Sequence, residues 1–188
     1  MPKKTKEPLP TERELEATLQ SLYYVGVQCA TWHLLQTAIE SVRAGDESLA
    51  NMMHNSLVES ALLFVRKTVE FFKPEEDNDW SDNIYAYHYC GYTGSEWLLD
   101  RDKGYADLHK RVGHVSVAEV RYGKLDWPLD RWVMLCLDKW IEFFDEVSTI
   151  PSALNPKRAT QCRKNTKRLR DVKSRVNAES DFNRTATS

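Results

Sequence analysis

Apolar side chains that recur every three or four residues restrict the fold of this chain more than any other feature. The clearest run begins after Pro128, with apolar positions at Leu129, Trp132, Cys136, Trp140, Phe143 and Val147. Side chains at this spacing share one face of an α-helix. Asp126 can cap the helix, Pro128 suits its first turn, and Pro151 ends it. The pattern predicts an amphipathic helix that buries one face against others.

The same spacing occurs in three other segments. The first, 11–45, opens with Thr11 and Glu14, which have the spacing of a capping box, and the second is 48–72. The third, 105–122, contains a glycine and several valines, which lower its helix propensity. With the run after Pro128, these segments predict an all-α fold, a helical bundle of four principal helices.

The composition predicts three regions along the chain. We expect residues 1–10 to be a flexible N-terminus and residues 11–150 to be the helical bundle domain, with a short additional helix at 84–92. After Pro151 the chain becomes rich in Ser, Asn, Thr, Lys and Arg. We therefore expect residues 151–188 to be a basic, largely disordered tail, helical at most where it contacts a partner.

The charge of the chain is uneven. The segment from Asn155 to Arg175 holds nine Lys or Arg and one acid, so it carries +8, whereas the whole chain carries −2. Such a segment can bind phosphate polymers or fold back on its own acidic domain. Its candidate nucleic-acid-binding residues are Lys157, Arg158, Arg163, Lys164, Lys167, Arg168 and Arg170.

Several kinds of site lack their sequence signatures. The four cysteines are scattered without a C-x-x-C pair, and no H-E-x-x-H, Walker A, G-x-G-x-x-G or G-x-S-x-G motif occurs. No stretch approaches the roughly 18 consecutive apolar residues of a membrane helix. We expect reduced cysteines, a cytoplasmic location, no membrane association, and neither a metal nor another cofactor.

One polar group lies on the predicted second helix. Asn55, Glu59, Arg66 and Glu70 project within about 60° of one another, beside the apolar face. A glutamate can hold an arginine in a bidentate pair, and an arginine fixed in this way can bind phosphate, so Asn55, Glu59 and Arg66 are candidate ligand-binding residues. The alternative is the solvated edge of an amphipathic helix.

A second polar group, Arg111, His114 and Arg121, lies on the predicted helix 105–122. These residues are three and seven positions apart, which makes them neighbours on one helix face. A neutral imidazole can accept a 2′-hydroxyl proton while guanidinium groups stabilise the phosphorane, so the three are candidate catalytic residues for RNA cleavage. The alternative is a partly buried histidine hydrogen-bonded to a carbonyl, beside two surface arginines.

Three segments of the chain are NSLVESALLFVRKTVEFF (55–72), DNIYA (82–86) and RVGHVSVAEVR (111–121), the last followed by WP. Together they resemble the HEPN-like proteins, small bacterial helical proteins of which some belong to abortive-infection and toxin–antitoxin systems. The resemblance implies a helical bundle that often dimerises. In active members it also implies metal-independent RNA cleavage by an Arg and a His separated by four to six residues. Here two residues separate Arg111 from His114, so that motif is not present.

Two functions remain open from the sequence. One is a HEPN-like protein that acts on or beside RNA in bacterial defence or a toxin–antitoxin system, and that is a candidate ribonuclease. The other is a non-catalytic, dimeric interaction module. In that module Glu59, Arg66 and His114 form an internal network, and the tail binds a partner or nucleic acid. The expected partners are RNA, a cognate protein and a second copy of the chain. Binding of nucleic acid through the tail alone is a third possibility.

Overall fold

The described part of this computed structural model consists of residues 9–73, 84–89, 92, 128–149 and 156–186, with side chains up to residue 178. It contains the α-helices α1 (Glu12–Arg43), α2 (Glu47–Phe71), α5 (Leu129–Thr149) and α6 (Pro156–Ala186), and the 3₁₀ turn η2 (Ala86–His88). No strand occurs in these ranges. The protein is an all-α helical bundle, as the apolar spacing predicts.

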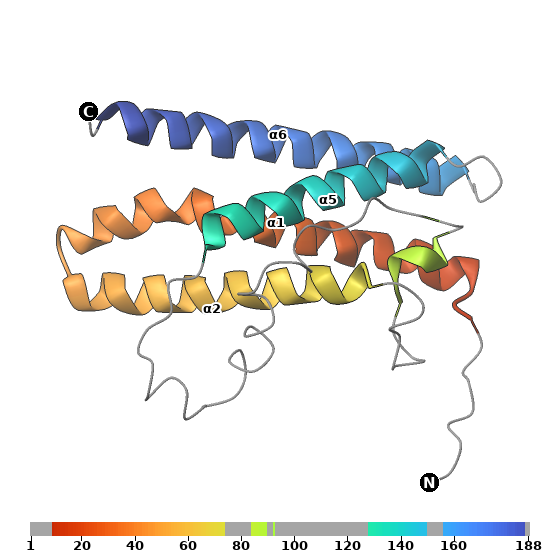
Figure 1. Cartoon of the computed structure of the whole chain (residues 1–188), viewed down its shortest axis with the longest axis horizontal. Coiled ribbons are helices and arrows are strands. Elements are labelled where there is room, and N and C mark those ends of the chain that lie inside the picture. Colours follow the sequence, from red (N-terminus) through yellow and green to blue (C-terminus); the bar gives the residue numbers. More distant parts are fainter. Residues whose placement is uncertain (1–8, 74–83, 90–91, 93–127, 150–155, 187–188) are drawn as a thin grey trace, which may run out of the picture.

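The helices lie side by side along their lengths. α1 packs against α2, α5 and α6, and α5 also packs against both α2 and α6. Figure 1 shows α6 along one side of the bundle and α2 along the other, with α1 and α5 between them. The outer surfaces of α6 and α2 therefore face solvent on different sides of the molecule.

The first helices begin where the sequence predicts. Thr11 Oγ1 accepts a hydrogen bond from Glu14 N at 3.3 Å, and the Glu14 carboxylate accepts one from Thr11 N at 2.7 Å, which completes the capping box. Asp46 caps α2 by accepting from Leu49 N at 2.9 Å. The predicted helices at 11–45, 48–72 and after Pro128 are confirmed as α1, α2 and α5. The predicted helix 105–122 lies outside the described residues.

The interior has an aromatic centre where α2 and α5 meet. Trp140 and Phe71 stack with ring centroids 4.9 Å apart, and Phe143 packs edge-on against both. The indole Nε1 of Trp140 donates to Thr68 Oγ1 at 3.0 Å, so this buried polar group is satisfied. These contacts hold α2 and α5 together.

The expectation of a largely disordered tail is wrong for residues 156–186, which form α6. Its inward side is one stripe of small apolar and neutral polar residues: Ala159, Cys162, Asn165, Thr166, Leu169 and Val176. α1 comes close at Gly26, where an added Cβ would lie 3.3 Å from Leu169 and 3.2 Å from Trp140. The stripe holds only one or two such residues per turn, so the polar composition of the segment hides it.

Candidate nucleic-acid interface

The outer surface of α6 is strongly basic. Five exposed cations lie there and form no ion pair with any described carboxylate: Arg163, Lys164, Lys167, Arg168 and Arg175. We call this set the α6 basic face. It covers about 18 Å of helix at 1.5 Å per residue. The exposed acid Asp171 lies among these cations. The face therefore keeps a clear positive charge.

Other cations of α6 are used to attach the helix to the bundle. Arg170 Nη2 lies 3.1 Å from Asp145 Oδ2, and Lys173 pairs with Asp138, so both bridge to α5. Their charges are already balanced by neighbouring carboxylates. Arg168 instead lies over the ring of Tyr23 on α1, 5.8 Å from its centroid. The cations that bridge to α5 are thus paired with carboxylates, whereas those of the α6 basic face remain available to a ligand.

Arg158 is a correction to the predicted set. Only 1% of its side chain is exposed, and its guanidinium pairs with Glu12 at the start of α1. Burial lowers the pKa of this guanidinium, although the neighbouring Cys162 thiol opposes that change. Its Nε and Nη1 have no hydrogen-bond partner among the residues that the structure describes. Because it is enclosed, Arg158 links α6 to α1 and cannot contact a polymer in solvent.

The predicted ligand-binding residues on α2 lie at the surface. Asn55 and Glu59 are exposed and Arg66 is partly buried. Within the described part of the chain, no hydrogen bond or ion pair joins them, so the bidentate Glu59–Arg66 pair is not formed there. Their arrangement matches the solvated edge of an amphipathic helix. The predicted catalytic residues Arg111, His114 and Arg121 lie outside the described residues.

The described cysteines are unsuited to nucleophilic chemistry. Cys29, Cys136 and Cys162 are free and buried. Burial raises the pKa of Cys162 to about 11 and raises that of Cys136 well above its usual value. Since the thiolate is the reactive form, both remain protonated at neutral pH. Among the described residues, no group of three or more His, Cys, Asp or Glu side chains could hold a metal ion.

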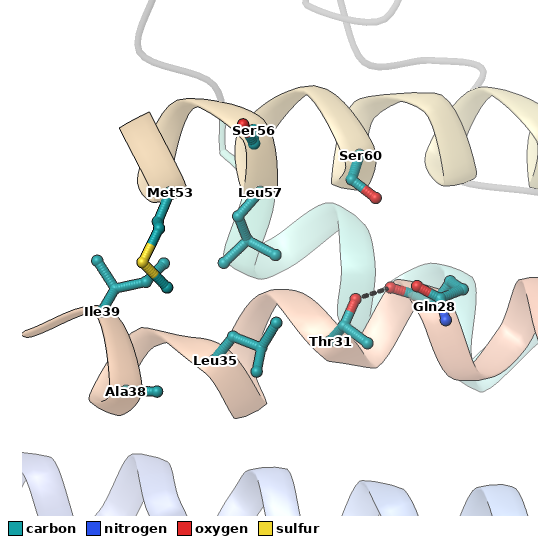
Figure 2. Close-up of a pocket in the computed structure, with 9 residues that line it drawn as sticks. All are labelled: Gln28, Thr31, Leu35, Ala38, Ile39, Met53, Ser56, Leu57 and Ser60. Atoms are coloured by element: carbon teal, nitrogen blue, oxygen red, sulfur yellow. Dashed lines mark hydrogen bonds between the residues drawn. The ribbon is translucent and has the colours of Figure 1, made fainter. Parts of the chain in front are cut away.

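A second surface was not predicted from the sequence. Six large apolar side chains are exposed on one side of the α1–α2 pair: Tyr24, Leu35, Leu49, Met52, Met53 and Leu63. We call this set the α1–α2 face. Leu35 and Met53 of this set line a hollow of about 300 Å³, shown in Figure 2, where Gln28, Thr31 and Leu35 on α1 lie opposite Ser56 and Ser60 on α2. The sequence signal is a second stripe on α2, at residues 49, 52, 53, 56, 60 and 63.

Comparisons with known proteins add no relative. No family model, no curated protein and no solved structure matches the chain. In the described ranges, no helix has the length and apolar character needed to cross a membrane. The described helices and their surfaces define the class of this protein, which is an all-α bundle with a basic outer helix and an exposed apolar face.

Proposed function

We propose that this protein binds RNA through the α6 basic face, as a cytoplasmic HEPN-like protein of bacterial defence or a toxin–antitoxin system. The observation that carries the proposal is that five exposed cations on one helix have no carboxylate partner among the described residues. Phosphates that neutralise such cations release counterions, which favours binding. The choice of RNA over other phosphate polymers rests on the resemblance of residues 55–72, 82–86 and 111–121.

A charge-matched pair of variants tests the binding. K164A/K167A removes two cations from the α6 basic face, whereas R170A/K173A removes two that pair with α5. We expect the first to weaken binding of a labelled single-stranded RNA about tenfold, and the second to change it no more than about twofold. Fluorescence anisotropy at fixed salt measures both. Equal losses would contradict the proposal, because the cations would then act only through net charge.

We further propose that bound RNA is cleaved without a metal, with His114 as the acid–base group and Arg111 and Arg121 as phosphate ligands. The chemistry of these residue types supports this step. Purified protein incubated with total RNA in EDTA should give cleavage products that H114A does not give. If RNA stays intact with wild-type protein that binds it, the protein acts on RNA without cleaving it.

The second candidate function is a non-catalytic interaction module that binds protein, and the α1–α2 face supports it. Isolated exposed apolar side chains are common, but several of them on one helix pair beside a hollow are typical of an interaction site. A cognate protein and a second copy of the chain are both candidate partners. The two functions use different surfaces, so one protein can have both.

A further inference from the structure

The α1–α2 face has a regular shape along α2. Leu49 and Met52 project at one end and Leu63 at the other, with Met52 the most exposed of these at 64%. The short side chains of Ser56 and Ser60 lie between them and border the hollow (Figure 2). The face therefore has large side chains at both ends and short side chains in the middle. Residue 56 is the midpoint between Leu49 and Leu63.

The charges at the two ends of this surface are opposite. Asp46 and Glu47 lie at the N-terminal end of α2, and both are exposed. Lys67 lies beyond Leu63, and its Nζ sits 5.2 Å from the Phe64 ring centroid without an ion pair in the described part of the chain. An antiparallel second α2 would place an acidic end beside a basic end. A parallel one would place like charges together.

We propose that a second copy of this chain covers the α1–α2 face, with the two α2 helices antiparallel and Ser56 near the two-fold axis. A two-fold axis pairs the same patch on both subunits, so that patch must be complementary to itself. The α1–α2 face meets this condition in shape and in charge. The α6 basic face does not, because two copies of it would repel. The inference names the partner for the interaction module and is independent of RNA binding.

The projecting side chains would supply the apolar contacts of such an interface. Leu49, Met52 and Met53 of one copy would lie over the Leu63 and Tyr24 end of the other. Methionine side chains adapt to irregular surfaces. Leu63 is 42% exposed, so it is available for contact with a second copy. The short side chains of Ser56 and Ser60 would allow the helices to approach closely at the centre. Stable interfaces bury about 800 Å² per partner, which requires α1 as well as α2.

The mass of the protein in solution is the first test. Light scattering after gel filtration, from 1 to 100 μM protein, should give wild type twice the 21.8 kDa chain mass. M52E/L63E places two carboxylates in the apolar surface and should give the single chain mass, with a helical circular-dichroism spectrum retained. T160E/A178E makes the same charge change on exposed α6 positions and should stay dimeric. Monomeric wild type, or dimeric M52E/L63E, would overturn the inference.

Cysteine cross-linking tests the position of the axis. Two copies of a residue beside a two-fold axis are close enough to form a disulfide with each other. With copper phenanthroline and oxygen as oxidant, S56C should cross-link at least tenfold faster than S60C or the α6 control S174C. Wild-type protein controls for the native cysteines. An S56C rate equal to that of S174C would overturn the inference. RNA affinity measured on the same samples decides the RNA proposal separately.

Discussion

The α6 basic face and the α1–α2 face differ in chemistry and in position. The first consists of cations on a helix that packs on α1 and α5, and the second consists of apolar and hydroxyl side chains on the α1–α2 pair. They lie on different sides of the bundle (Figure 1). Salt screens charge but does not weaken apolar contact. The bundle thus keeps the two proposed binding surfaces apart, and each should respond to its own conditions and substitutions.

Salt should give the largest difference between the two surfaces. Five cations in contact with single-stranded RNA imply a log–log salt slope of about −3.5, at roughly 0.7 per contact. A rise from about 0.05 to 0.2 M salt should weaken RNA binding about a hundredfold, while dimerisation should change only a few-fold. Anisotropy and sedimentation at matched salt measure both. Equal salt slopes would show that RNA binding and dimerisation depend on the same kind of contact.

The Arg158–Glu12 contact should be the next most sensitive point. E12Q leaves a buried guanidinium without its carboxylate, so we expect a loss of about 2 kcal/mol in unfolding free energy. R158M replaces the charge with an apolar group of similar length, and should cost less than E12Q. Urea denaturation measures both. A larger loss for R158M would contradict this account, because it would mean that the arginine side chain contributes more to stability than its pairing with Glu12.

The buried hydroxyl of Thr68 tests whether both surfaces depend on one interior. T68V removes the acceptor of Trp140 Nε1 and should lower the unfolding free energy by about 1–2 kcal/mol. T68S keeps the hydroxyl and should cost less. Under native conditions neither variant should change RNA affinity or dimer mass. A selective loss of one activity in T68V would show that the interior is coupled to that face.

Alkaline pH should give the smallest effect. Burial raises the pKa of Tyr89 to about 12 in the folded protein, against an ordinary value of 10. The folded state therefore holds this proton more tightly, so stability is complete below pH 10 and falls as pH rises towards 12. Tyr89 should account for about 1 kcal/mol at pH 10.5, measured as the difference between wild type and Y89F. A Y89F profile parallel to wild type would contradict this assignment.

The sequence predicts α1, α2 and α5 because each has a stripe of large apolar residues, such as Trp132, Trp140 and Phe143 on α5. It does not predict a packed α6, because Asn165 and Thr166 look like surface residues until their neighbours are known. Asn165 Nδ2 lies 3.5 Å from the Leu19 carbonyl oxygen, a partner 146 positions away. Local periodicity carries no information about such contacts.

The candidate site was predictable in composition but not in detail. The basic residues of α6 are visible in the sequence, but Asp138 and Asp145 lie 25 to 35 positions from the cations they balance. Only the docking of α6 on α5 separates Lys164 and Lys167 from Arg170 and Lys173. Arg158 is misassigned for the same reason, because its burial depends on α1.

The most direct test of the account measures RNA affinity and dimer mass together on two variants. K164A/K167A should lose about tenfold in RNA affinity and remain dimeric. M52E/L63E should become monomeric, and each monomer should bind RNA with an affinity within about threefold of wild type, since its α6 basic face is unchanged. That pattern would establish two separate surfaces. A variant that loses both activities while its helical content and unfolding midpoint stay unchanged would contradict the account.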